Sequence, residues 1–279
     1  MPIAHVRGVS LDYEILGETG PFVVLQPGGR RAGSVLRPLA LKIAEAGNRV
    51  VIYDRRNTGR SSIAIDGESE NQEWADDLHA LLREIDAGPA FVGGSSSGCR
   101  LALLLALQHP EAVRGLLLWR VTGGAHAAEH LTNQYYTSHI EAARHGGMEE
   151  VCKLDHWSEV IGINPQARGV LMALDPDDFT GRMNWWRRSF QAGADYPVIG
   201  LSPAELRSMT MPACIAPGMD PVHPLSAGQA AHRLMPNAEY AEVVTEQRAT
   251  LDEAFADWET REGLLAARFI DFLRRHGRR

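Results

Sequence analysis

One serine lies between two glycines, in a stretch that predicts a strand followed at once by a helix. Residues Phe91–Ser95 are apolar or small and residues Leu101–Leu107 are apolar on every side, which indicates a buried strand and a buried helix. Between them, Gly94-x-Ser96-x-Gly98 provides the small neighbours that a sharp strand-to-helix turn needs. Such a turn holds the serine hydroxyl against the helix N-terminus and the next backbone N–H. The spacing therefore favours Ser96 as a nucleophile over a plain Gly/Ser turn.

The elements that must position this serine alternate between strands and helices. Continuous apolar runs predict buried strands at 22–26, 49–53 and 115–119, and apolar residues at helical spacing predict helices at 34–46 and 74–85. Ser34 is the expected cap of the first of these helices. Solid apolar strands joined by helices indicate an α/β fold, in which a mostly parallel sheet carries helices on both faces. The site of such a sheet lies beyond the carboxyl ends of its strands, where Ser96 is expected.

The alternation is interrupted in the middle of the chain. A hairpin at 3–7 and 11–16 opens the chain, and residues from about 124 to 205 are helical in pattern and rich in His, Met and Trp. The alternation then resumes with a strand at 211–216, a helix at 225–234, a strand at 239–244 and a helix at 257–275. We therefore expect a core formed by residues 1–120 and 206–279, with a helical cap inserted at 121–205.

Composition argues against several classes of partner. The 279 residues carry a net charge of −7, and the basic run at 274–279 is interpreted as a solvated helix end, so no nucleic acid is expected. No uninterrupted apolar run approaches the roughly 18 residues of a membrane span, and no leader-like N-terminus is visible, so a cytoplasmic protein is expected. Cys99, Cys152 and Cys214 are far apart and predict buried free thiols. No metal and no cofactor are expected.

Several loops, together with the serine turn, resemble those of the α/β-hydrolase superfamily over essentially the whole chain. Gly94-x-Ser96-x-Gly98 is similar to the GxSxG of that family, and Pro27-Gly28-Gly29 stands where the family has its oxyanion loop. The run 54–61, Asp-Arg-Arg-Asn-Thr-Gly-Arg-Ser, is similar to a DxRGxGxS loop in which Asn57 replaces a glycine. Its Asp54 and Arg56 are expected to brace the loop and not to touch substrate.

The resemblance implies roles for particular residues. Ser96 would be the nucleophile, and the N–H groups of Ser97 and Gly29 would line the oxyanion hole. The run 217–224, Pro-Gly-Met-Asp-Pro-Val-His-Pro, resembles the loop that carries the catalytic acid, which would be Asp220. The chain is thus expected to have an α/β-hydrolase fold with a helical cap.

The resemblance breaks at the catalytic base. The family has a histidine on the loop after the last strand, but here that loop reads Thr-Glu-Gln-Arg at 245–248. A serine hydroxyl without a base is a very weak nucleophile at neutral pH. His223, on the loop of the acid, is the preferred substitute, although it could instead brace that loop. Glu246 is an alternative, weaker as a base than imidazole by about two pKa units.

The remaining candidate residues belong to the predicted cap. His126 follows the 115–119 strand and could face the pocket, or be a solvated cap residue. Trp157, Trp185 and Trp186 are expected to cover an apolar pocket, although tryptophans more commonly hold a helical layer together.

The resemblance implies hydrolysis of a small, largely apolar molecule with an ester, lactone, amide or activated C–C bond. Two alternatives stay open because the usual histidine is absent: a receptor-like protein that keeps the pocket, and a lyase or cyclase on the same fold. The expected partner is a small-molecule substrate, and a homodimer is allowed.

Overall fold

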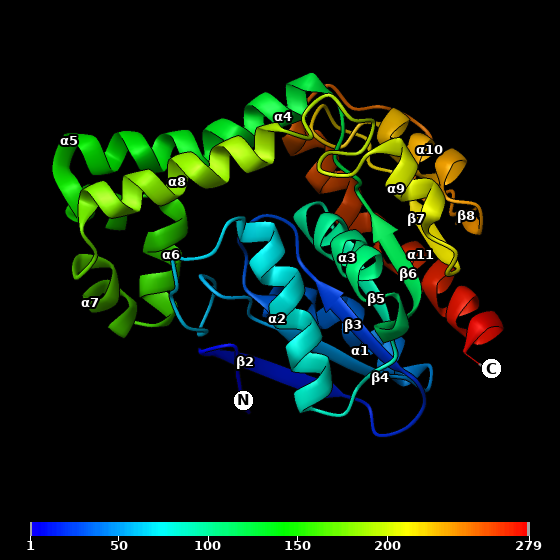
Figure 1. Cartoon of the computed structure of the whole chain (residues 1–279). Helices are drawn as coiled ribbons and strands as arrows, with labels where there is room; N and C mark the ends of the chain where they lie inside the picture. Colours follow the sequence, from blue (N-terminus) through cyan, green and yellow to red (C-terminus); the bar gives the residue numbers. More distant parts are fainter. Residues whose placement is uncertain (1, 278–279) are drawn as a thin grey trace.

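A computed structural model describes residues 2–277 of the chain, which form a twisted sheet covered by helices (Figure 1). Within these residues the sheet has eight strands in the order β1-β2-β4-β3-β5-β6-β7-β8. The strands are β1 (Ile3–Val6), β2 (Val9–Leu16), β3 (Phe22–Gln26), β4 (Arg49–Tyr53), β5 (Ala90–Ser95), β6 (Val113–Trp119), β7 (Ala213–Ala216) and β8 (Ala238–Tyr240). The contacts of β2 with β1 and β4 are antiparallel and all others are parallel. The predicted fold class, mostly parallel α/β, is confirmed.

Both faces of the sheet are covered because its central strands carry apolar residues on both faces. Alternate residues of a strand point to opposite faces, so Val24 and Val92 pack on one side while Leu25 and Phe91 pack on the other. The first side is covered by α2 (Glu70–Glu84), α3 (Ser97–Gln108), α9 (Pro203–Ser208) and α10 (Leu225–Leu234). The second is covered by α1 (Arg37–Glu45) and α11 (Leu251–His276).

A third group of helices lies between β6 and β7 in the chain and has its own apolar interior. These helices are α4 (Ala125–Thr132), α5 (Ser138–Cys152), α6 (Asp155–Ile163), α7 (Gln166–Met172) and α8 (Pro176–Gln191). Figure 1 shows α5 and α8 side by side, extending past the edge of the sheet. Their buried side chains, among them Trp157, Phe179 and Trp186, form a cluster separate from the two sheet faces. The division of the chain at residues 121 and 205 stays a prediction.

The observed elements differ from the predicted ones at several ends, of which three have a clear cause. Ser34 caps no helix, because it lies in a 3-10 turn (Gly33–Leu36) and α1 begins only at Arg37. The strand predicted at 239–244 ends at Tyr240, and the chain then turns away in a loop. α11 begins earlier than predicted because Thr250 and Glu253 form a capping box.

Three further sequence predictions concern the cysteines, membrane spans and the basic end. Cys99, Cys152 and Cys214 are free and buried, as predicted. Burial raises the pKa of the Cys99 and Cys214 thiols to about 12, so both are protonated at neutral pH. No helix of the described chain is both long and apolar enough to cross a membrane. The last two residues of the basic run, at 278 and 279, lie outside the described residues.

The packing of the serine turn gives a first prediction, which uses two glycine substitutions. A Cβ added at Gly94 would lie 2.2 Å from the carbonyl carbon of Gly98, whereas Gly169 on α7 has no heavy atom within 4 Å of the same position. We expect Gly94→Ala to lower the free energy of unfolding by about 3 kcal/mol through overpacking. Gly169→Ala should instead stabilise the exposed helix by about 0.5–1 kcal/mol. Urea denaturation of both variants measures the difference, and equal effects would contradict the packing argument.

Candidate active site

Ser96 lies at the turn between β5 and α3, in a backbone conformation that few residues other than glycine adopt. Its φ is 55° and its ψ is −113°. Its backbone N–H donates to the Trp119 carbonyl oxygen at 3.2 Å, which ties the turn to the neighbouring strand β6. The flanking glycines are needed for space, because a Cβ at Gly98 would lie 2.5 Å from the Gln26 carbonyl oxygen. The unfavourable backbone conformation is therefore confined to Ser96, whose side chain lies at the tip of the turn.

The loop after β3 passes directly beside this serine. The parallel pairing of β3 with β5 sets Gln26 opposite Gly94, so the residues that follow both strands meet at one edge. A Cβ at Gly28 would lie only 3.0 Å from the Ser96 Cβ, which shows how closely the backbone approaches. The Gly29 carbonyl oxygen accepts hydrogen bonds from the Ser97 hydroxyl at 2.8 Å and from Arg55 at 2.6 Å. The backbone N–H groups of Gly29 and Ser97 have no acceptor within residues 2–277, and both stay available to a ligand.

Asp220 and His223 lie on one tight turn after β7. The pairing of β7 with β6 sets Ala216 opposite Trp119, so this turn opens at the same edge as Ser96. The turn is closed by backbone hydrogen bonds in both directions between Asp220 and His223, at 3.3 and 3.1 Å. The Asp220 Oδ1 atom also accepts the N–H groups of Val222 and His223, at 2.9 and 2.8 Å. Two backbone N–H groups therefore orient the Asp220 carboxylate, independently of its contacts with side chains.

The three side chains form a continuous hydrogen-bonded series. The His223 Nδ1 atom lies 2.8 Å from both carboxylate oxygens of Asp220, and the Nε2 atom lies 2.8 Å from the Ser96 hydroxyl oxygen. Asp220 is fully buried, and His223 is 5% and Ser96 6% exposed. A carboxylate only accepts, so Nδ1–H donates to Asp220, which leaves Nε2 to accept the serine O–H.

Burial and charge set the protonation states of this series. Burial is the main cause that lowers the pKa of His223 to about 4; the Arg120 charge lowers it further, and the hydrogen bond to Asp220 opposes the shift. Burial alone would raise the pKa of Asp220, but hydrogen bonds from His223 and the charge of Arg120 hold it below its ordinary range. At neutral pH the pair is therefore an ionised carboxylate and a neutral imidazole.

The loop that carries the base in the superfamily points away from Ser96 here. The Glu246 side chain is 75% exposed and forms an ion pair with Arg248 at 3.1 Å. The Gln247 side-chain oxygen accepts the N–H of Leu225 at 3.2 Å. Of the two alternatives for the base, the structure brings only His223 to the serine.

A cavity of about 900 Å³ opens in front of Ser96 and His223. Its wall is formed by the loops after β3 and β6, by α4 to α6, and by α11. Apolar and aromatic side chains such as Leu131, Tyr135 and Trp258 share the wall with basic side chains and with four carboxylates, those of Asp155, Glu159, Glu259 and Glu262. The size is that of a pocket for a small organic molecule.

Four residues predicted to bind substrate do not line this cavity, and the sequence prediction is corrected for each. His126 is exposed on α4, and Trp185 is 47% exposed on α8. Trp157 is buried against the rings of two neighbouring histidines. Trp186 is buried too, and its indole N–H donates to the Gly67 carbonyl oxygen at 3.2 Å. Both buried tryptophans therefore hold the helical layer together.

Sequence reasoning missed other residues of the wall, in particular Arg31, Arg120 and His130. Arg31 lies on the loop after β3 and Arg120 directly follows β6, both at the edge where Ser96 is expected. The rule that finds Ser96 at the carboxyl edge could have found these two arginines as well.

The loop after β4 has a bracing role, as predicted. Asp54 accepts the N–H groups of Gly33 and Arg60, at 2.7 and 2.8 Å, while Arg56 is bidentate to Asp77 at 2.6 and 2.7 Å. Asn57, which replaces the glycine of the family, has a φ of 67°. Asparagine is among the few residues that tolerate this left-handed conformation, so the replacement preserves the loop.

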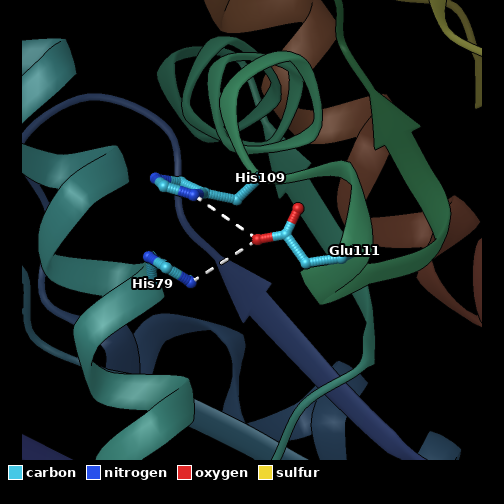
Figure 2. Close-up of side chains that lie close together, drawn as sticks. All are labelled: His79, His109 and Glu111. Carbon is cyan, nitrogen blue, oxygen red and sulfur yellow. Dashed lines mark ion pairs between the residues drawn. The ribbon is translucent and has the colours of Figure 1, made fainter.

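A second group of titratable side chains lies at the opposite edge of the sheet, before β6 (Figure 2). The Glu111 Oε1 atom lies 3.6 Å from His109 Nδ1 and 4.0 Å from His79 Nε2. The two imidazole rings are stacked, with centroids 3.7 Å apart and planes inclined by 17°. The ligand atoms of these three side chains all lie within 4.8 Å of one another, which is close enough for them to share a metal ion.

Comparisons with known proteins agree with this architecture. Residues 21–132 match a family model described as the alpha/beta hydrolase fold. Over 114 residues the chain is 37% identical to the uncharacterized hydrolase YraK of Bacillus subtilis, covering 40% of this chain and 41% of that protein. Over 127 residues it is 36% identical to the putative carbamate hydrolase RutD of Azorhizobium caulinodans, covering 46% of each chain. The matches thus span less than half the length of these curated relatives.

A solved structure extends the likeness to the whole fold. The enol-lactonase of Burkholderia xenovorans LB400 superposes with a TM-score of 0.61 at 20% identity, over 95% of this chain and 99% of that one. The family match contains the serine turn and the Gly28-Gly29 loop, but neither Asp220 nor His223. The sheet order and the matched segment together show that the chain has the α/β-hydrolase fold.

Proposed function

We propose that the chain is a hydrolase that uses Ser96 to cleave an ester, lactone, amide or activated C–C bond in a small molecule. The observation that carries the proposal is the 2.8 Å contact between His223 Nε2 and the Ser96 hydroxyl. A receptor-like relative has no need of a base on its serine. The names of the two relatives as hydrolases support the same reading.

The geometry supports a two-step acyl transfer. In the first step the Ser96 oxygen attacks the substrate carbonyl carbon while its proton moves to His223 Nε2. The negative charge on the carbonyl oxygen is stabilised by the N–H groups of Gly29 and Ser97 and by the N-terminus of α3. His223 then gives its proton to the leaving group, and an acyl-serine is left.

In the second step water takes the place of the serine. His223 accepts a proton from the water as the water attacks the acyl carbon, and then returns that proton to the Ser96 oxygen as the ester bond breaks. Asp220 keeps the imidazole in the tautomer that both steps use, and its charge stabilises the imidazolium that forms in each. No proton or electron is left over after one turnover.

Labelling by a fluorophosphonate tests whether Ser96 is activated by His223. We expect stoichiometric labelling of the wild type at Ser96 and none of Ser96→Ala. His223→Ala should slow labelling by about 10²- to 10⁴-fold, because general-base assistance is lost. Glu246→Ala removes the exposed carboxylate on the loop after β8, where the superfamily has its histidine, and should label at the wild-type rate. Slow labelling of Glu246→Ala with normal labelling of His223→Ala would transfer the role to Glu246.

A single-atom change at Asp220 tests the positioning of the base. In Asp220→Asn the amide still fills the turn, but it can donate to His223 Nδ1 and favour the wrong tautomer. We expect kcat to fall by about four orders of magnitude with little change in the urea midpoint. Retention of full activity in a folded variant would exclude Asp220 from the mechanism.

The pKa of His223 predicts the pH profile. The imidazole must be neutral to accept the serine proton, so activity is lost as the pH falls through the pKa of His223. Because that pKa is lowered to about 4, kcat/KM for a neutral ester should stay level down to about pH 5. The charged or titratable groups that face the ring are Asp220, Arg120 and His130. An acidic limb near pH 6.5, the ordinary value for histidine, would show that the ring is solvated during catalysis.

A further inference from the structure

Two guanidinium groups face the cavity from either side of Ser96. Arg31 follows β3 and Arg120 follows β6, and both strands pair with β5, which leads to the serine. Both side chains line the cavity. Burial is the main cause that lowers the pKa of Arg120, and the charge of Arg31 adds to the shift, so the two groups lie close enough to repel each other. Two like charges that converge on one space destabilise the empty cavity.

The protein neutralises this pair of charges only in part. Arg31 is exposed to the cavity and has no hydrogen bond or ion pair with any residue from 2 to 277. Arg120 is 12% exposed, and its nearest carboxylate oxygen, on Asp220, lies at 3.5 Å, the limit of a hydrogen bond. The buried Nε atom of Arg120 has no partner among the described residues. Its guanidinium otherwise stacks on the Phe255 ring, 4.4 Å from the centroid.

A third arginine in the same wall provides an internal comparison. Arg30 also lines the cavity, but its guanidinium is paired with the buried Glu70 at 2.9 Å and bonded to His139 at 3.1 Å. The structure therefore satisfies an arginine where the arginine serves the fold. Arg31 has no such carboxylate among the described residues, and Arg120 shares the carboxylate of Asp220 with His223.

The position of Arg120 also opposes the proposed chemistry. Its Nη2 atom lies 3.4 Å from His223 Nδ1, so its charge disfavours the imidazolium that forms in each step. An enzyme for neutral substrates would work better without this charge. An anion bound between the two arginines would remove the penalty at the moment when the substrate is in place.

We propose that the cavity takes substrates that carry a carboxylate within a few bonds of the scissile carbonyl group, and that Arg31 and Arg120 bind this carboxylate. The inference rests on the proposed function of Ser96 and narrows its substrate class. A carboxylate is planar and matches the two parallel N–H donors of a guanidinium group. With its single negative charge it also repels the Asp220 carboxylate less than a doubly charged group would. Arg31 and Arg120 are then specificity-determining residues, and Arg120 couples substrate binding to the basicity of His223.

Two esters of matched shape test this proposal. Mono-p-nitrophenyl succinate and p-nitrophenyl 4-methylpentanoate differ in having a carboxylate or an isopropyl group at the end of the acyl chain. We expect wild-type kcat/KM to be higher for the succinate, and Arg31→Gln and Arg120→Gln each to lower the succinate-to-neutral ratio by about tenfold, as expected for loss of a charge-assisted hydrogen bond. Arg268→Gln, the same change on the exposed surface of α11, should leave the ratio within about twofold of wild type.

The outcomes separate this inference from the proposed function. A wild type that favours the neutral ester, or a ratio that neither cavity variant changes, overturns the carboxylate proposal. If Ser96-dependent hydrolysis of the neutral ester persists in that case, the proposed function stands. Arg31→Gln alters an exposed side chain, so the test does not depend on whether Arg120→Gln folds.

A binding measurement decides the case in which neither ester is hydrolysed. Isothermal titration of the succinate ester into Ser96→Ala reports binding without turnover. We expect Ser96→Ala/Arg31→Gln to bind about tenfold more weakly, with Ser96→Ala/Arg268→Gln as the control. Equal affinity of all three proteins would exclude the carboxylate site even though the proposed hydrolase activity had also failed.

Discussion

The hydrogen-bonded turn from Asp220 to His223 is the interaction on which the candidate site depends. Its backbone bonds close a loop of four residues, and the same carboxylate that accepts two backbone N–H groups also accepts the imidazole N–H. Asp220 and His223 therefore hold each other in place within one turn. A Cβ at Gly218 would lie 2.2 Å from the His223 carbonyl oxygen, so the turn folds back on a residue that has no side chain.

This arrangement changes what supports the base. In the superfamily pattern the acid and the histidine come from the loops after two successive strands, so their contact depends on how those loops pack. Here one turn carries both residues, and the loop after β8 contacts the segment around this turn only through hydrogen bonds of Gln247 and Arg248 among the described residues. β8 is only three residues long, and the loop behind it presents the exposed Glu246 to solvent. The fold tolerates this because the loops after β7 and β8 open at the same edge of the sheet.

The electrostatics of the site follow from burial as much as from contact. Asp220 stays ionised because donors surround it, and His223 stays neutral because burial disfavours the charged imidazolium. Arg120 compensates the carboxylate only in part, since their closest approach is 3.5 Å. The charges of Asp220, His223 and Arg120 sum to zero while the imidazole is neutral. The sum would become positive when His223 accepts the serine proton. An anionic group on the substrate would restore the balance at that step.

The sequence could predict the parts of the site that depend on the direction of the strands and on close contacts between backbone segments. Glycine is needed where neighbouring segments of the chain pass too close for a Cβ atom, as they do at Gly28, Gly94 and Gly98. The spacing of the glycines in the sequence already indicates this need. Asp220 and His223 were expected at the right edge because they follow a predicted parallel strand. The prediction for the cap tryptophans failed because the face of a helix that turns inward depends on its neighbours. Trp185 and Trp186 are adjacent in sequence, yet one is 47% exposed and the other is buried.

The same reasoning explains why the arginines of the cavity wall were overlooked. A charged residue after an apolar strand is typical of a solvated loop, and only the three-dimensional structure shows whether a carboxylate meets it. Arg30 and Arg31 are neighbours in the sequence, and one is paired with Glu70 while the other has no partner among the described residues. The sequence alone cannot separate them, because the difference lies in the distance to α2. An arginine that stabilises the fold therefore differs from one that binds a ligand in having an ion-pair partner within the folded chain. The residue type alone does not show whether such a partner exists.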